Sequence, residues 1–151
     1  MDQIISKQTA ILAKELGFRE KCIYYYCNNG EYSVNEYSDG SGYGVEIDDL
    51  VFDYNGMYTD RVSAPLQLSL QGWLREKHGI WVSVVDDYCD GIFISYKVVD
   101  YGHSGGVHPG MPEDYHNPED YYNVLEDGLF KALGILKTRQ HEKDNSSNGK
   151  V

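Results

Sequence analysis

Apolar residues recur at helical spacing near the start of the chain. Ile5, Leu12 and Leu16 fall on one face of such a helix, because residues about three to four positions apart share a face. Ser6 is a residue type that caps helix starts, and Gly17 is a type that ends helices. The pattern therefore predicts a first helix over residues 6–16.

Two further segments have the apolar stripe of a helix that packs on a core. One is expected to start at Ser63-Ala64-Pro65 and to end near His78, with a stripe made of Leu66, Leu70, Trp73 and Leu74. The other is expected to start at Asn117-Pro118, which combines a capping residue with a proline in the first turn. Its stripe continues for about four turns and comprises Tyr121, Leu125, Leu129, Ala132, Leu133 and Leu136.

Two pairs of short segments have the residue types and alternation of β-strands. Residues 21–27 and 31–37 flank Asn28-Asn29-Gly30, and Asn and Gly tolerate the positive φ of tight turns, so this region predicts a hairpin. Residues 80–86 and 91–99 predict a second hairpin, whose later strand turns Ile92, Ile94, Tyr96 and Val98 toward the core. A further strand is expected over 45–52.

The remaining segments predict a loop and a tail. Residues 100–116 are rich in glycine, proline and histidine, which predicts a long loop, and residues 138–151 are polar, which predicts a disordered tail. The element order contains no run of βαβ units and therefore favours an α+β fold. We expect a two-layer domain over 1–137, in which three helices pack on an antiparallel sheet of about four to five strands.

Charge is unevenly distributed along the chain. The 151 residues include 13 Lys and Arg against 24 Asp and Glu, a net charge of −11. Residues 31–60 carry eight acids and no Lys or Arg, and residues 81–130 carry ten acids and the single Lys97. Nucleic-acid affinity depends on Lys and Arg that neutralise phosphates, so this distribution disfavours direct binding of DNA or RNA.

The cysteines and the first residues bear on the compartment. Cys22, Cys27 and Cys89 are an odd number of thiols in a chain long enough to bury a core without disulfides. Lys7, Lys14 and Glu15 interrupt the apolar residues before a signal-peptide core can form. Both features indicate a cytoplasmic protein without a membrane partner.

Two segments resemble a known family. The pattern Q-x-x-L-Q-x-W-L-R-E-x-H-x-I is matched from Gln67 to Ile80, and the pattern L-E-x-G-L-x-x-A-L is matched from Leu125 to Leu133. These passages resemble a family of small uncharacterised proteins of phage and prophage regions in gut anaerobic bacteria. The resemblance implies a mobile-element context and one compact domain, and it implies no activity. The histidine-rich loop is longer than the connection typical of that family.

That loop also holds the candidates for metal binding. His103, His108 and His116 lie near acidic residues, but their spacings of five and eight residues differ from those of helical metal-binding pairs. Residues 102–106 have the G-x-S-x-G pattern, yet the glycines and prolines that follow forbid the helix that a nucleophilic serine requires. Solvated histidines are therefore favoured over a metal site, and no catalytic residue or cofactor is predicted.

Tyrosine is the one compositional anomaly, with 14 residues, about three times the usual frequency. Successive strand residues face opposite sides, so the run 24–26 cannot be buried on one face. Tyrosine is also enriched at protein interfaces. The candidate partner-binding residues are Tyr24, Tyr26, Tyr32, Tyr37 and Tyr43, and a tyrosine-rich sheet face without a partner is the alternative.

These observations favour a small, acidic, non-enzymatic accessory protein of phage or mobile-element origin that binds another protein. In a sharper variant, its carboxylates imitate a phosphate backbone and occupy a DNA-binding or defence protein. The alternative is an enzyme, or a protein that binds a metal or small ligand, built on the histidine-rich loop 103–116.

Overall fold

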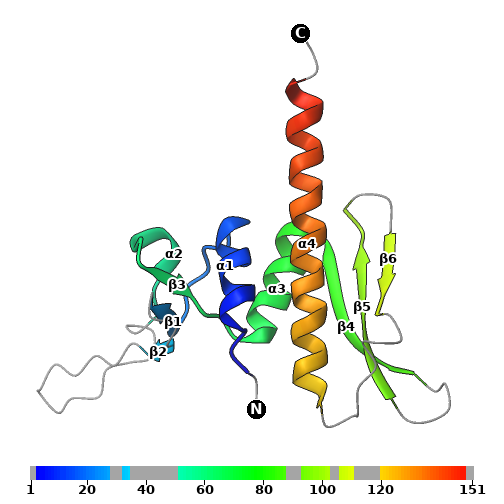
Figure 1. Ribbon diagram of the computed structural model, residues 1–151, viewed down its shortest axis with the longest axis horizontal. Coiled ribbons are helices and arrows are strands. Elements are labelled where there is room, and N and C mark those ends of the chain that lie inside the picture. The colour runs from blue at the N-terminus through cyan, green and yellow to red at the C-terminus, as the bar shows by residue number, and fades with distance from the viewer. Residues whose placement is uncertain are drawn as a thin grey trace, which may run out of the picture. The chain divides into compact units, whose positions relative to one another are not determined.

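In the part of the chain that the structure describes, helices and antiparallel strands follow one another without a parallel βαβ unit. The computed structural model describes residues 3–27, 32–34, 51–87, 93–102, 106–110 and 120–148. Within these residues there are four helices and two three-stranded antiparallel sheets, which confirms the predicted α+β class (Figure 1). The strands therefore form two sheets, whereas the sequence predicts one.

Contacts divide the chain into two compact units. The N-terminal unit is Ile4–Leu66, and the C-terminal unit comprises Met1–Gln3 and Gln67–Val151. Each unit has buried apolar residues of its own, so each is described by itself.

The N-terminal unit begins with helix α1, Lys7–Glu15. The hydroxyl of Ser6 accepts a hydrogen bond from the Thr9 amide at 3.2 Å, and Gly17 has a φ of 91°, which glycine adopts without strain. Ala10 and Ala13 are buried on one face of the helix. The first predicted helix is thus confirmed, with both of its predicted end signals.

Three short strands form the sheet of the N-terminal unit, in the order β2-β1-β3. Strand β1, Tyr24–Cys27, pairs antiparallel with β2, Tyr32–Val34, which confirms the first predicted hairpin. Strand β3, Arg61–Ser63, pairs with the other edge of β1. The expected strand over 45–52 lies outside the described residues except for its end, where Phe52 forms an isolated bridge with Cys22.

A short helix and a buried amide complete this unit. Helix α2, Tyr54–Met57, is capped by Asp53, whose carboxylate accepts from the Gly56 amide at 2.8 Å. The side chain of Asn55 donates to the Phe18 carbonyl at 3.0 Å and accepts from the Ser63 amide at 2.9 Å. The bond from the Ser63 amide to Asn55 holds Ser63 in β3. Ser63 therefore does not cap the next helix, although the sequence predicts that it does.

The C-terminal unit contains the longer sheet, ordered β4-β5-β6. Strands β4, Ile80–Asp87, and β5, Phe93–Asp100, pair over eight residues each, which confirms the second predicted hairpin. Strand β6, Gly106–Pro109, pairs with the end of β5 inside the segment predicted to be a loop. A proline is tolerated there because β6 is an edge strand of this sheet and needs fewer backbone donors.

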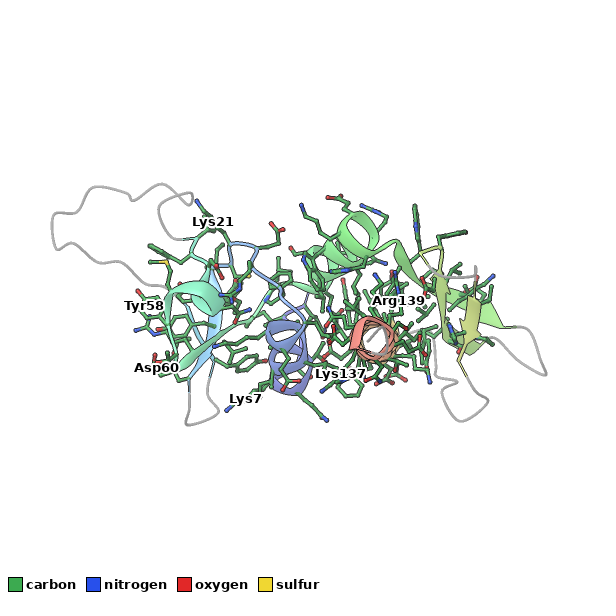
Figure 2. All side chains as sticks on the ribbon, turned by 90° about the horizontal axis from the view of Figure 1, so that it is seen from above. Lys7, Lys21, Tyr58, Asp60, Lys137 and Arg139 are labelled. Carbon is green, nitrogen blue, oxygen red and sulfur yellow. The ribbon has the colours of Figure 1, made fainter. Side chains whose placement is uncertain are left out.

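Two helices pack against this sheet. Helix α3, Gln67–His78, and helix α4, Tyr121–Asn148, contact each other and strand β4, and α4 also contacts β5. Viewed along α4, side chains crowd between this helix, α3 and the sheet, with Arg139 among them (Figure 2). The buried apolar residues include Leu70, Leu74, Val82, Val98, Leu125, Leu129 and Leu133.

Helix α4 is longer than its apolar stripe predicts. It continues to Asn148, so residues 138–148, which the sequence predicts to be disordered, are helical, and residues 141–146 are exposed. Lys137, Arg139, Gln140 and Glu142 favour helix through their backbone propensity, which explains how the helix outlasts the stripe. Within the described residues, no helix has both the length and the apolar character needed to cross a membrane.

Two glycines of α4 predict opposite effects on stability. A Cβ at Gly128 would lie 2.8 Å from Val82 Cγ1 and 2.9 Å from Tyr96 Cβ, so Gly128→Ala should lower the free energy of unfolding by about 1–3 kcal/mol. A Cβ at Gly134 would meet nothing within 4 Å, so Gly134→Ala should raise it by about 0.5–1 kcal/mol. Urea unfolding followed by circular dichroism measures both, and a shift of the same sign in both variants would contradict the packing described.

Candidate functional site

One face of the β4-β5-β6 sheet carries exposed apolar side chains. Val82 and Tyr96 point to the face that approaches Gly128 of α4, so the residues that alternate with them point to the opposite face. On that face the register places Trp81 opposite Val99, and Val99 opposite Val107. The three side chains therefore form a row across all three strands.

Tyr101 extends this row by one position. Its amide donates to the Gly79 carbonyl at 3.0 Å, which keeps the chain in register beyond the end of β5. Its ring therefore lies diagonally across from Trp81, and the two rings meet edge to face with centroids 6.3 Å apart. Trp81 is 50% exposed and Tyr101 is 67% exposed, so both rings offer surface to a partner.

Arg75, from the last turn of α3, completes the cluster. Its guanidinium carbon lies 5.4 Å from the centroid of the Trp81 ring, within the range of a cation–π interaction. The same guanidinium lies 3.5 Å from a carboxylate oxygen of Glu76. We call this cluster the Trp81 surface; it consists of Arg75, Trp81, Val99, Tyr101 and Val107.

Among the side chains that the structure describes, the exposed positions of this sheet face are Trp81, Ser83, Lys97, Tyr101, Val107 and Pro109. Lys97 is the one charged residue among these described positions. At the side of α3, the carboxylate of Glu76 accompanies the Arg75 guanidinium.

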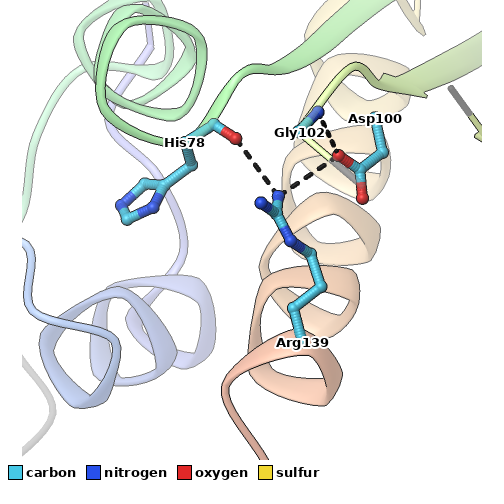
Figure 3. A network of polar contacts seen from close by, with 4 residues as sticks. All are labelled: His78, Asp100, Gly102 and Arg139. Atoms are coloured by element: carbon cyan, nitrogen blue, oxygen red, sulfur yellow. Dashed lines mark hydrogen bonds and ion pairs between the residues drawn. The ribbon is translucent and has the colours of Figure 1, made fainter. Parts of the chain in front are cut away.

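A polar cluster lies inside the C-terminal unit, where α3, β5 and α4 meet (Figure 3). Arg139 of α4 donates to the Asp100 carboxylate at 3.2 Å and to the His78 carbonyl at 3.1 Å. Asp100 also accepts from the Gly102 amide at 2.9 Å. The side chains of Arg139 and Asp100 are only 12% and 7% exposed, so this ion pair is largely shielded from water.

The environment of His78 is unfavourable for a proton. Its Nε2 atom is buried and has no hydrogen-bond partner among the described residues. Its ring packs edge to face on that of Trp73, with the two ring centroids 4.4 Å apart. Burial lowers the pKa of His78, and the charges of Arg139 and Lys143 lower it further. Since Arg139 and Asp100 already bond to each other, we assign this cluster a structural role, as a clamp between three elements.

The predicted metal candidates are only partly described. His108 lies in β6 opposite Val98 and is half-buried, while His103 and His116 lie outside the described residues. Within the part of the chain that the structure describes, no three His, Cys, Asp or Glu side chains come together as a metal site would require. Metal or ligand binding by the histidine-rich loop therefore stays a prediction.

The predicted partner-binding tyrosines are also only partly described. Tyr24 and Tyr26 are half-buried on β1, and the hydroxyl of Tyr26 donates to the Ile5 carbonyl at 2.7 Å. The backbone of Tyr32 pairs with that of Tyr26, and Tyr37 and Tyr43 lie outside the described residues. The hydrogen bond of Tyr26 gives this side chain a role within the unit itself.

The thiol of Cys22 offers little nucleophilic chemistry at neutral pH. Cys22 and Cys27 are free, and burial raises the pKa of Cys22 to about 12. Because the thiolate is the reactive form, Cys22 is unreactive near neutrality.

Sequence reasoning missed the Trp81 surface, although a signal for it was present. The alternation that turns Tyr96 and Val98 inward also turns Val99 outward, and strand pairing then places Trp81 beside it. The pairing of β6, which adds Val107, had no signal in its glycine- and proline-rich segment.

The chain matches no protein-family model, no curated protein and no solved structure. The candidate site therefore depends on geometry and chemistry alone.

Removing the charge of Arg139 tests the clamp. Arg139→Met leaves the Asp100 carboxylate buried without its cation, which should lower the free energy of unfolding by about 3–5 kcal/mol. The double variant Arg139→Met, Asp100→Asn removes both charges and should recover part of this loss, as measured by urea unfolding. Equal losses in the single and double variants would contradict a shielded ion pair.

The lowered pKa of His78 predicts a loss of stability in acid. Below the usual pKa of 6.5, the unfolded chain takes up a proton that the folded chain resists, so the free energy of unfolding should decrease as the pH falls through 6.5. His78→Gln should flatten this decrease, because it removes the group whose pKa differs between the folded and unfolded chain. Urea unfolding between pH 5 and pH 8 measures both slopes; identical slopes would contradict the prediction.

Proposed function

We propose that this protein is a non-enzymatic accessory protein that binds another protein through the Trp81 surface. The observation that carries the proposal is the grouping of an exposed Trp81, an exposed Tyr101 and Arg75 on one sheet face. Tryptophan, tyrosine and arginine are the residue types that dominate binding energy at protein interfaces. Their grouping on one face supports a binding role.

The geometry of the cluster suits an interface centre. The Trp81 and Tyr101 rings restrain each other, and the Arg75 guanidinium restrains Trp81 from the side of α3. Rings held in this way lose little conformational freedom when a partner covers them, which lowers the cost of binding. Val99 and Val107 extend the apolar area beside them.

Charge indicates the chemistry of the partner. Lys97 is exposed on the same sheet face, two residues along β5 from Val99, and the exposed sheet positions whose side chains the structure describes include no acid. A partner that places apolar side chains on the two rings and a carboxylate near Lys97 would complement this face. We therefore propose a partner with an apolar contact region and an acidic rim.

The biological setting is a further part of the proposal. The resemblance of residues 67–80 and 125–133 to phage-associated proteins supports an accessory role in a mobile element, and the odd number of cysteines supports the cytoplasm. Mimicry of nucleic acid would require carboxylates spaced like phosphates. Many acids of the segment 31–60 lie outside the described residues, so this variant stays a prediction.

Truncating the two rings should weaken partner binding. Full-length protein purified from its host, with nuclease treatment, is used to identify a stoichiometric partner, whose affinity is then measured with purified components. Trp81→Ala and Tyr101→Ala should each weaken binding by about 30-fold, the effect of losing a hot-spot side chain. Tyr121→Ala is the matched control, because Tyr121 is an exposed aromatic residue of α4 with 44% exposure.

A separate variant, Lys97→Glu, tests the proposed acidic rim of the partner. Lys97→Glu should slow association with an acidic rim and reduce its dependence on salt, with little change in dissociation. Equal affinities for the Trp81→Ala, Tyr101→Ala and Tyr121→Ala variants would refute the proposed surface. Faster association of Lys97→Glu would refute the acidic partner and leave the surface itself standing.

A further inference from the structure

Arg61, the first residue of β3, is enclosed by tyrosines of the N-terminal unit. Its guanidinium carbon lies 4.3 Å from the centroid of the Tyr58 ring and 4.7 Å from that of Tyr25. Cys27 pairs with Arg61, so Tyr25, two residues earlier on β1, is its diagonal neighbour on the same sheet face. Two separate elements therefore hold the guanidinium over aromatic rings.

The third ring of this cluster carries a hydroxyl without a partner. The Tyr54 ring lies 4.5 Å from that of Tyr25 and 6.0 Å from that of Tyr58. Tyr54 is 1% exposed, and its hydroxyl makes no hydrogen bond to any described residue. Burial raises the pKa of Tyr54 to about 12, while the charge of Arg61 acts in the opposite direction. The hydroxyl is therefore a neutral donor without an acceptor.

The guanidinium of Arg61 also lacks a polar partner in the part of the chain that the structure describes. Stacking on rings occupies the faces of a guanidinium and leaves its N–H donors free along the edge. Neither the described hydrogen bonds nor the described ion pairs include these donors, although the chain has 24 acids. Asp60, the neighbouring residue, is exposed beside Tyr58 (Figure 2).

A second cation lies against the same segment. The ammonium group of Lys14 donates to the Arg61 carbonyl at 2.7 Å and to the Tyr58 carbonyl at 3.4 Å. These bonds fix the ammonium beside Arg61 and Tyr58. The cluster thus combines two positive charges with a buried hydroxyl donor.

We propose that Arg61, Lys14 and the Tyr54 hydroxyl form a binding site for an oxyanion, either a carboxylate or a phosphate. The planar edge of a guanidinium matches two oxygens of either group, and the Tyr54 hydroxyl supplies a further donor. Such a ligand would pair the Arg61 donors and the Tyr54 hydroxyl, which have no hydrogen-bond partner among the described residues, while Lys14 adds positive charge beside them. The site lies in the N-terminal unit and does not rest on the Trp81 surface.

Titration of the full-length protein with sodium phosphate, and separately with sodium acetate, tests this site. Chloride keeps the ionic strength constant, and the Nε–H signals of arginine are followed by NMR. The Arg61 signal should shift saturably with at least one of the two anions, and the anion that saturates it identifies the ligand class. The absence of a saturable shift with both anions would overturn the proposal.

Three variants separate this site from general anion effects. Arg61→Gln should abolish saturable binding, whereas Arg19→Gln, which removes an exposed arginine of the same unit, should leave it unchanged. Tyr54→Phe should weaken binding by about tenfold, the effect of losing one charge-assisted hydrogen bond. It should not destabilise the ligand-free protein, because it removes an unpaired buried hydroxyl. Unchanged binding in Arg61→Gln would overturn the proposal.

Discussion

The close approach of α4 to the β4-β5 hairpin determines the architecture of the C-terminal unit. Gly128 lets the helix backbone come within van der Waals distance of Val82 and Tyr96, where a larger residue would clash. This contact selects one sheet face as the inner face. Because side chains alternate along a strand, it also assigns Trp81, Val99 and Val107 to the outer face. The proposed binding surface is thus a consequence of core packing.

The same helix carries the polar clamp of this unit. Arg139 lies beyond the apolar stripe of α4 and reaches both Asp100 at the end of β5 and the carbonyl of His78 at the end of α3. A buried ion pair costs desolvation energy, and its geometry must repay that cost. Here the contacts of Arg139 fix the end of β5, which Tyr101 follows, and the end of α3, after which the chain continues to Trp81. The backbone of residues 78–81 and 100–101 therefore links the buried Arg139–Asp100 ion pair to the contact between the Trp81 and Tyr101 rings on the surface of the unit.

The tyrosines of the N-terminal unit have more than one role. Tyr26 bonds to the backbone of the unit, whereas Tyr25 and Tyr58 lie over Arg61 and Tyr54 packs against their rings. Alternation along β1 separates these roles, since Tyr25 and Tyr26 face opposite sides of the sheet. The unusual tyrosine content of the chain therefore includes core packing, internal hydrogen bonding and a cationic cluster.

The sequence by itself determined the α+β class, the first helix with its caps, and both hairpins, because these features depend on local periodicity and turn chemistry. It also determined which side of β5 faces the core. Only the tertiary structure decided that the strands form two sheets, that β3 pairs with β1 and β6 with β5, and that Ser63 belongs to a strand. It also decided that Trp81 meets Tyr101 and Arg75, and that Arg61 lies over Tyr25 and Tyr58. The pairing of β3 with β1 and the contact of Trp81 with Tyr101 join residues far apart in the chain. The other contacts depend on the path of the backbone between their partners, which local periodicity does not encode.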